Sequence, residues 1–191
     1  MGHFLFLQEF FKGASSIGAV LPSSPRLAGL LVEKANVKNS SEILELGPGE
    51  GVVSREILKA KRKDSRFLAV EKNPRFVQLL KARNPEIPVI EGCGTRLTEH
   101  TREHEMNSVD CVVSGLPWAA FPADLQVTIL HQVMATLKPG GTFATFAYFG
   151  PHWLPAGQSF RKKLQSAFSH IHTSRIELAN LPPAFVYFSQ K

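Results

Sequence analysis

The feature that most constrains this chain is a glycine-rich turn that directly follows a short apolar run. Residues 43–46 read Ile-Leu-Glu-Leu, which predicts a short buried strand. Gly47, Gly49 and Gly51 come next, where a helix is expected to begin. Glycines there let the backbone take unusual dihedral angles and approach a ligand with no Cβ atom in the way. The sequence therefore predicts a strand, a ligand-binding turn and a helix, in that order.

An acidic residue ends the next apolar run, twenty residues after the last of these glycines. Residues 67–70 read Phe-Leu-Ala-Val and predict a second strand, and Glu71 follows directly. A carboxylate at the end of that strand can accept two hydrogen bonds from ribose hydroxyls. The alternative is an ordinary glycine-rich turn with a solvent-exposed Glu71. Strand, glycines, second strand and acid in register favour a nucleoside-binding half of a doubly wound sheet.

The glycine spacing indicates a class of cofactor. A dinucleotide-binding turn has the pattern G-x-G-x-x-G, whereas this turn has G-x-G-x-G, with Glu45 two residues before its first glycine. The pattern resembles the first motif of S-adenosylmethionine (SAM)-dependent methyltransferases with a Rossmann-like fold. The resemblance implies that Glu45 anchors the turn and the methionine end of SAM. The cofactor-binding residues that it implies are Ile17, Gly18, Glu45, Gly47, Gly49, Gly51, Glu71, Lys72, Cys93, Gly94 and Ser114.

Length and composition limit the other possibilities. With 191 residues, of which 43% are hydrophobic and 20% charged, the chain is expected to form one soluble domain with a substantial core. Cys93 and Cys111 are too few and too scattered for a disulfide framework or a zinc site, which favours a reducing compartment. No apolar run reaches the length of a membrane span and no secretory signal is visible, so a cytoplasmic location is expected. The net charge of +6 favours anionic partners, either nucleic acid or an anionic membrane surface.

Helical and extended segments alternate along the chain, which is typical of an α/β sheet. Small polar caps followed by proline mark two helix starts, with Ser23 or Ser24 before Pro25 and Asn73 before Pro74. Residues 25–191 are therefore predicted to form one Rossmann-like domain with a seven-stranded, mostly parallel sheet and an antiparallel last strand. The expected helices are 25–36, 51–61, 74–83, 123–137 and 159–168, and the further expected strands are 89–92, 108–114, 142–148, 172–178 and 184–189.

Four local strings narrow the family. They are IGAVLPSS at 17–24, LELGPG at 44–49, VSGLP at 113–117 and NLPPA at 180–184. Together they resemble the bacterial phospholipid N-methyltransferases. The resemblance implies methylation of the amine of phosphatidylethanolamine or its methylated derivatives toward phosphatidylcholine, at the inner face of the cell membrane. The chain is also distantly similar to the rRNA adenine dimethyltransferases, so an RNA base is the alternative substrate.

The segment Ser114–Trp118 separates the two substrates. In the adenine dimethyltransferases the matching string is Asn-Leu-Pro followed by an aromatic residue, and the Asn side chain accepts a hydrogen bond from the adenine amine. Here Gly115 stands at the Asn position, before Leu116 and Pro117, so one acceptor is missing. Trp118 retains an aromatic face that suits an alkylammonium through cation–π attraction, worth about 0.5–2 kcal/mol. These residues favour a lipid amine, the alternative being a tight turn with Trp118 in the core.

Two tyrosines and an arginine complete the predicted substrate site. Tyr148 ends a predicted strand, where its hydroxyl and ring are expected to meet the amine, and Tyr187 on the last strand is the second choice. Each is alternatively a core tyrosine with a satisfied hydroxyl. Arg175 is a candidate ligand for the lipid phosphate, and the histidines show no metal-ligand spacing, so no metal is expected. The predicted catalytic residues are Tyr148, Gly115, Leu116, Pro117, Trp118 and Tyr187.

One departure from the family pattern concerns the adenine of SAM. Related enzymes place an Asp in a Gly-Asp-Ala string to accept from the adenine amine, whereas this chain has Gly92-Cys93-Gly94, and a thiol is a poor acceptor. Either the backbone or Thr95 takes that role, or the affinity for SAM is lower. Glu50 inside the glycine turn is a second departure. A SAM- or membrane-binding protein without catalysis is therefore a further alternative.

Residues 1–24 are expected to form an N-terminal amphipathic helix and loop that covers the site. Positions 4–11 hold six large apolar residues, interrupted by Gln8 and Glu9. On a helix they form a broad apolar stripe, which in monotopic enzymes lies in the membrane interface. The alternative is a helix that packs on its own domain or on a partner subunit.

Overall fold

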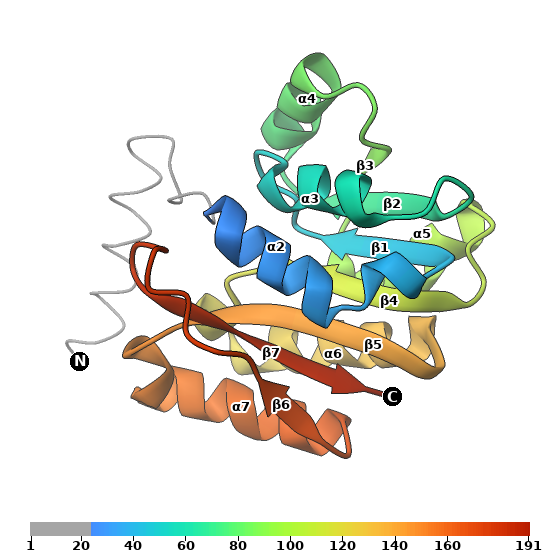
Figure 1. The fold of residues 1–191 in the computed structure, drawn as a ribbon. Helices are drawn as coiled ribbons and strands as arrows, with labels where there is room; N and C mark the ends of the chain where they lie inside the picture. The colour runs from blue at the N-terminus through green and yellow to red at the C-terminus, as the bar shows by residue number, and fades with distance from the viewer. Residues whose placement is uncertain (1–23) are drawn as a thin grey trace.

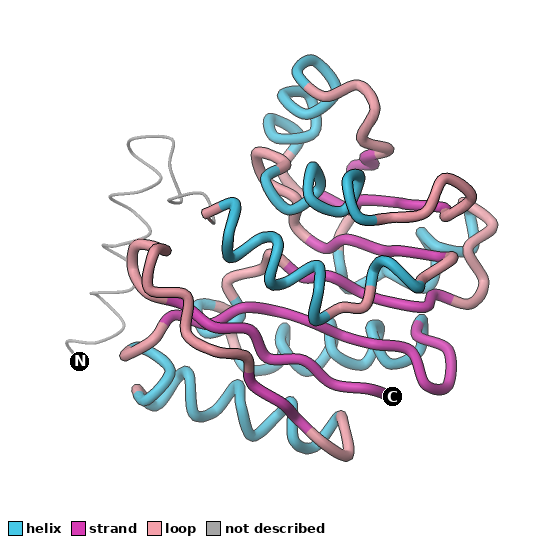
Figure 2. The backbone as a smooth tube through the Cα atoms, in the orientation of Figure 1, coloured by secondary structure: helices cyan, strands magenta, loops and turns pink. Residues whose placement is uncertain are grey.

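A seven-stranded sheet with helices on both faces forms the part of the chain that the computed structural model describes, residues 24–191 (Figures 1 and 2). The prediction of a helix at 1–24, with Ile17 and Gly18, therefore lies outside the described residues except for Ser24. The helices are α2 (Pro25–Lys34), α3 (Val52–Ala60), α4 (Pro74–Arg83), α5 (Leu97–Glu103), α6 (Ala123–Thr136) and α7 (Pro155–Ala167). The strands are β1 (Glu42–Leu46), β2 (Arg66–Glu71), β3 (Val89–Glu91), β4 (Val109–Ser114), β5 (Leu137–Tyr148), β6 (Ile171–Thr173) and β7 (Ala184–Gln190).

The strand order is β3-β2-β1-β4-β5-β7-β6. All neighbours from β3 to β5 pair in parallel, while β7 pairs antiparallel with both β5 and β6. The central strands are buried on both faces, so they read as almost continuous apolar runs rather than as alternating ones. The predicted fold, mostly parallel with an antiparallel last strand, is confirmed.

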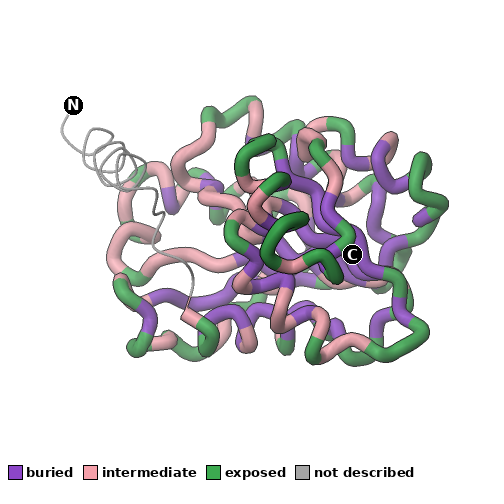
Figure 3. The backbone as a smooth tube through the Cα atoms, turned by 90° about the horizontal axis from the view of Figure 1, so that it is seen from above, coloured by how far each residue is buried: buried purple, intermediate pink, exposed green. Residues whose placement is uncertain are grey.

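The sheet separates two apolar cores. On one face, Leu31 of α2 and Ile57 of α3 pack with the inner strands. On the other face, Val133 of α6 and Leu164 of α7 pack with the same strands. Strands β1 and β4 are almost entirely buried, and Figure 3 shows long buried stretches of backbone crossing the molecule. Within residues 24–191, no helix combines the length and hydropathy needed to cross a bilayer.

Two helix starts have the caps that the sequence predicted. The Ser24 hydroxyl accepts a hydrogen bond from the backbone N–H of Leu27 at 3.2 Å, and proline follows at the first position of α2. The Asn73 side chain accepts from the backbone N–H of Arg75 at 3.0 Å, again before a proline. These bonds satisfy N–H groups that a helix end leaves without partners.

The sequence missed α5 and misplaced three boundaries. α5 contains a single apolar residue, Leu97, and so shows no apolar period. α7 begins at Pro155, four residues earlier than predicted, because proline is favoured at a first helical position. β5 begins at Leu137, so it includes residues 138–141, which were predicted to form a turn. Its pairing with β4 is irregular at this point. β6 ends at Thr173, and the remainder of the strand predicted at 172–178 is loop.

Candidate cofactor and methyl-acceptor site

The glycine turn after β1 is held in a backbone conformation that side chains disfavour. Gly47, Gly49 and Gly51 have φ values of 69°, 54° and 79°. The N–H of Gly47 donates to the carbonyl of Val70 at 3.0 Å, which ties the turn to β2. A Cβ atom on Gly49 would meet no other atom within 4 Å, so this glycine borders open space. The turn therefore offers a ligand a close approach to bare backbone at Gly49.

Glu71, at the end of β2, lies directly beside this open glycine. One carboxylate oxygen accepts from the N–H of Gly49 at 3.1 Å, and the other accepts from the N–H of Asn73 at 2.8 Å. Only 8% of Glu71 is exposed, so the alternative of a solvent-exposed acid is wrong. The carboxylate and the open backbone together fit the ribose end of SAM, which is where the sequence placed it.

Glu45 is fully buried beneath the turn. One carboxyl oxygen accepts a hydrogen bond from the Ser54 hydroxyl of α3 at 2.6 Å, and the other has no hydrogen-bond partner among the described residues. Burial raises the pKa of Glu45 to about 8; the Ser54 bond opposes this rise, and the negative charge of Glu71 adds to it. Glu45 therefore joins the turn to α3, while its predicted contact with the methionine end of SAM stays a prediction. Sequence inspection did not single out Ser54.

The Ser114 side chain is engaged within the protein. It is fully buried, and its hydroxyl accepts from the indole Nε1–H of Trp118 at 3.0 Å. Its carbonyl accepts from the Thr145 hydroxyl at 3.1 Å. A side chain enclosed in this way positions Trp118, and the predicted contact of Ser114 with the cofactor stays a prediction.

Cys93 and its neighbours form the other side of the predicted cofactor site, after β3. The Thr95 hydroxyl donates to the Cys93 sulfur at 3.1 Å. Partial burial acts to raise the pKa of the Cys93 thiol, but the hydrogen bonds from Thr95 and the charge of Lys72 outweigh it, so this pKa is lowered overall. Gly94 follows, and a Cβ atom on it would lie 3.3 Å from Ile129 of α6. Thr95 thus interacts with the thiol, while the alternative in which Thr95 accepts from the adenine amine of SAM stays a prediction.

Gly115 leaves no space for a side chain. A Cβ atom built on it would lie 2.6 Å from the carbonyl oxygen of Gly47, closer than real Cβ contacts come. The N–H of Gly115 donates to the carbonyl of Leu46 at 2.8 Å, which fixes the segment against the glycine turn. The Leu116 side chain packs on Gly47 from the same segment. The two turns therefore interlock, and the position of the adenine-binding Asn is sterically closed.

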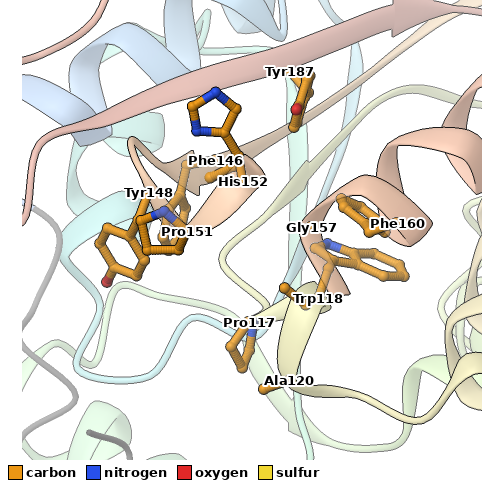
Figure 4. A pocket seen from close by; sticks show the side chains of 12 residues that line it. Pro117, Trp118, Ala120, Phe146, Tyr148, Pro151, His152, Gly157, Phe160 and Tyr187 are labelled. Carbon is orange, nitrogen blue, oxygen red and sulfur yellow. The ribbon is translucent and has the colours of Figure 1, made fainter. Parts of the chain in front are cut away.

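A pocket with mainly aromatic walls opens at the carboxyl edge of β5, where Pro117 and Trp118 meet α7 (Figure 4). Its volume is about 50 Å³, room for a group of a few water molecules' size. It contains no carboxylate among its described lining residues. The lining residues are Pro117, Trp118, Ala119, Ala120, Phe146, Ala147, Tyr148, Pro151, His152, Gly157, Phe160 and Tyr187.

Trp118 forms a wall of this pocket but does not present an open face. Its ring stacks on Phe160 with centroids 5.1 Å apart and an interplanar angle of 15°, and it meets Phe143 edge-on at 6.0 Å. Only 2% of the residue is exposed. The alternative of a tight turn with Trp118 in the core therefore describes it better than the predicted cation–π surface. Its partner Phe160 was not foreseen, because α7 was expected to begin later.

Tyr148 and Tyr187 both line the pocket, and their catalytic role stays a prediction (Figure 4). Burial raises the pKa of each phenol, so both hydroxyls are protonated near neutral pH. His152 was not predicted at the site; partial burial lowers the pKa of its imidazole, which keeps the ring neutral. The ring nitrogen Nδ1 of His152 is 3.1 Å from the N–H of Gly150. The available signal was its place just after the strand that Tyr148 ends.

Arg175 lies apart from this pocket. It borders a separate cavity beside α2, together with Arg26, Glu33 and Glu177. The structure therefore does not bring Arg175 together with the tyrosines in one cavity, and a contact with lipid phosphate stays a prediction. Among residues 24–191, no group of three or more His, Cys, Asp or Glu side chains is arranged to hold a metal ion.

Sequence comparison identifies residues 43–141 as a methyltransferase domain. The ornithine lipid N-methyltransferase of Singulisphaera acidiphila is 33% identical over 188 residues, which cover 97% of this chain and 94% of that protein. The dimethyladenosine transferase of Kluyveromyces lactis is 31% identical over 112 residues, which cover 59% of this chain and 34% of that protein. The similarity to the lipid methyltransferase extends over both chains, whereas the similarity to the adenine methyltransferase is partial.

Solved structures agree with the fold. The O-methyltransferase of Bacillus cereus in complex with SAH has a TM-score of 0.72 at 11% identity and covers 97% of this chain and 90% of that chain. TomG of Streptomyces achromogenes in complex with SAM has a TM-score of 0.69 at 16% identity and covers 97% of this chain and 89% of that chain. At such identities the likeness establishes the fold, and the family follows from the sequence matches. The chain therefore belongs to the SAM-dependent N-methyltransferases with a Rossmann-like fold, in the family of the ornithine lipid N-methyltransferase, as its resemblance to the bacterial phospholipid N-methyltransferases predicted.

Proposed function

We propose that this enzyme methylates the amine of a membrane-lipid head group, with phosphatidylethanolamine and its methylated derivatives as substrates and ornithine lipid as the comparison substrate. The full-length relative carries ornithine lipid in its name, and the four sequence strings resemble phospholipid enzymes. Such an enzyme works at the cytoplasmic face of the membrane as a peripheral protein.

The observation that carries the proposal is the steric closure at Gly115. An adenine amine is held by an Asn side chain at this position in the enzymes that methylate RNA. Here the carbonyl oxygen of Gly47 occupies the place that the first side-chain atom would need, at 2.6 Å. An RNA base would therefore lose a buried hydrogen-bond acceptor, a defect that costs about 1–3 kcal/mol. A lipid amine does not depend on that acceptor.

The adjoining pocket supports the same assignment. Its described walls are aromatic or aliphatic, with Tyr148, His152 and Tyr187 as its titratable groups. Ring faces of this kind attract methylated ammonium groups, which are less hydrated than a primary ammonium. The volume of about 50 Å³ suits a methylated amine at the end of a head group.

The chemical work left to the chain is mainly positioning. SAM, when bound, supplies a methyl group on a sulfonium that needs no further activation. Glu71 and the backbone at Gly49 would hold its ribose, and the pocket walls would align the amine lone pair with the bond that breaks. No carboxylate lines the described pocket, so the proton of the ammonium is expected to leave to water before transfer. The protonated hydroxyls of Tyr148 and Tyr187, which line the pocket, would orient the amine.

A side-by-side assay with radiolabelled SAM tests this function. The purified enzyme is offered phosphatidylethanolamine, its mono- and dimethyl forms and ornithine lipid in detergent micelles, and rRNA in parallel, with Glu71→Ala as the cofactor-deficient control. We expect label in one or more lipids and none in RNA. Label only in RNA would overturn the proposal, and SAM binding without label in any substrate would favour the non-catalytic alternative.

A further inference from the structure

Two loops at the carboxyl edge of the sheet expose large apolar side chains next to the pocket. Residues 149–154 connect β5 to α7, and residues 174–183 connect β6 to β7. Within them, Trp153, Leu178 and Leu181 are 63%, 75% and 77% exposed, and Phe149 and Ile176 are each 37% exposed. We call these five residues the apolar rim. Of the large hydrophobic residues that are exposed in the described chain, only Val127 lies outside it.

One hydrogen bond joins the two loops, and Asn180 anchors the second loop. The N–H of Phe149 donates to the carbonyl of Pro183 at 2.8 Å. Asn180 is buried; its side-chain oxygen accepts from the N–H of Ser24 at 2.8 Å and its amide donates to the carbonyl of Pro182 at 2.6 Å. Leu178 and Leu181 therefore project from an anchored backbone. In Figure 1 the loop before β7 stands beside the start of α2, at the end of the sheet where β5 finishes.

The rim is continuous with the pocket that Tyr148 and Tyr187 line. Tyr148, which lines the pocket, immediately precedes Phe149. His152 also lines the pocket, and its ring centroid is 4.7 Å from that of Trp153 and 5.3 Å from that of Phe149. A surface that takes up lipid at the rim would therefore deliver the head group directly to the pocket.

The charges around the rim fit an anionic partner. Residues 149–158 contain no Asp, Glu, Lys or Arg, so their desolvation costs little. Arg161 is near enough to His152 to lower the pKa of its imidazole, and Arg175 directly precedes Ile176. Glu177 is the acid of the second loop, and its carboxylate accepts from the N–H of Ala179 within that loop at 3.2 Å.

From this juxtaposition we propose that the apolar rim inserts into the interface of an anionic lipid bilayer. Trp153 would lie at head-group depth, where tryptophan is favoured, and Leu178 and Leu181 would enter the acyl boundary. Arg161 and Arg175 would contact lipid phosphates. The inference rests on the proposed function, and it adds that the substrate amine reaches the pocket while its acyl chains remain in the bilayer.

Tryptophan fluorescence provides the test, because the two tryptophans are Trp118 in the core and Trp153 on the rim. Vesicles of phosphatidylglycerol and phosphatidylcholine should shift the emission of the full-length protein to shorter wavelength, and brominated lipid should quench it. Leu178→Glu and Leu181→Glu together should weaken vesicle binding roughly tenfold or more, because exposed leucines lose their burial in lipid. Val127→Glu on α6, also an exposed apolar residue, is the matched control and should bind as the parent does. If the double variant binds vesicles as the parent does, or if vesicles cause no emission shift in the parent, the proposal that the rim inserts into the bilayer would be overturned.

Methylation assays separate failure of the rim from failure of the proposed function. With lipid dispersed in detergent micelles, the double variant should methylate as the parent does, while its rate on vesicles falls. If the parent inserts Trp153 into vesicles but methylates no lipid, the proposed function would be contradicted, while the proposal that the apolar rim inserts into the bilayer would be supported. If instead the chain's own apolar run at 4–11 covers the rim, Phe6→Glu with Phe10→Glu would shift Trp153 emission to longer wavelength without vesicles, which would overturn the proposal.

Discussion

At the scale of single residues, two buried carboxylates beside the glycine turn have opposite tasks. Glu71 accepts two backbone N–H bonds at the open side of the turn, which suits a charged carboxylate. Glu45 is enclosed, with one oxygen lacking a hydrogen-bond partner in the described chain, and burial raises its pKa to about 8. One acid is thus available to a ligand, while the other is part of the scaffold.

Removing the Glu71 carboxylate should weaken SAM binding. Glu71→Ala loses two charge-assisted hydrogen bonds to the ribose, each worth about 1.5–3 kcal/mol, so we expect a loss in affinity of at least roughly tenfold by calorimetry. Glu71→Gln is the size-matched control, and its affinity for SAM should lie between the affinities of Glu71→Ala and of the parent. Thermal melting must accompany the titration, because Glu71 also holds Gly49 and Asn73. An affinity within about twofold of the parent would show that the ribose is held elsewhere.

Glu45 should make stability fall as the pH rises. Its folded pKa of about 8 lies above the usual 4.5, so between these values the native state binds one more proton than the unfolded state. The free energy of unfolding then decreases with pH, by up to about 1.4 kcal/mol per unit from this group. The side chain in Glu45→Gln cannot ionise. The free energy of unfolding of this variant, measured in urea, should therefore rise relative to that of the parent from about pH 5 to about pH 8. Parallel curves for variant and parent would contradict the buried titration.

Gly115 should tolerate no side chain. Gly115→Ala places a Cβ atom 2.6 Å from the Gly47 carbonyl, so one of the two turns must move. A displacement of about 1 Å at a reacting centre costs on the order of 100-fold in rate, and Gly115→Asn should lose lipid methylation at least as strongly. Gly29→Ala on α2 is the control, because its Cβ meets nothing within 4 Å. A Gly115→Asn enzyme that keeps lipid activity and gains RNA methylation would contradict the lipid assignment.

Sequence reasoning located residues whose role is local and missed those whose role depends on distant elements. Glu71 and Gly115 follow their strands directly, so strand prediction alone placed them at the carboxyl edge. Trp118 was assigned an open face because its burial depends on Phe160, far along the chain on α7. The hydrogen bond from the Trp118 indole to the Ser114 hydroxyl was not foreseen either, because it too depends on how the segment after β4 folds back.

At the scale of elements, the loop before β7 shows how two sequence strings act together. The strings at 17–24 and 180–184 were selected for family resemblance alone. In the structure their ends meet, because Asn180 accepts from the N–H of Ser24. Residues 172–178 were predicted to form a strand, and Ile176 and Leu178 alternate with polar residues there. Those side chains face outward instead, which is the pattern expected if lipid, and not the core, is to cover them.

Asn180 should therefore be a stability determinant of this loop. Asn180→Ala removes a buried acceptor and donor, leaving the Ser24 N–H and the Pro182 carbonyl without partners, and should cost about 1–3 kcal/mol in denaturant unfolding. Asn39→Ala is the matched control, because Asn39 makes its side-chain bond to Asn36 in solvent. If both variants were equally stable, the loop would be held by other contacts.

At the scale of the whole molecule, positive charge is present at both edges of the sheet, but with different neighbours. The net charge of +6 does not by itself choose a partner. Arg161 and Arg175 accompany the apolar rim at the carboxyl edge. Lys38 and Lys63 are exposed at the opposite edge, since they precede β1 and β2 along the chain. Only the first pair combines charge with exposed apolar surface, so orientation on a membrane should depend on it.

Neutralising each pair in turn should distinguish binding through one face of the protein from attraction by its net charge. Each basic residue near an anionic surface is worth about 1 kcal/mol, so Arg161→Gln with Arg175→Gln should weaken binding to anionic vesicles roughly thirtyfold at low salt. Lys38→Gln with Lys63→Gln changes the net charge equally and should have little effect, because those residues face away from the bilayer. Methylation on vesicles should follow the same order. Since screening grows with ionic strength, the difference between the pairs should shrink as salt is added. Equal losses for both pairs would mean that the protein is attracted by net charge alone, with no preferred face.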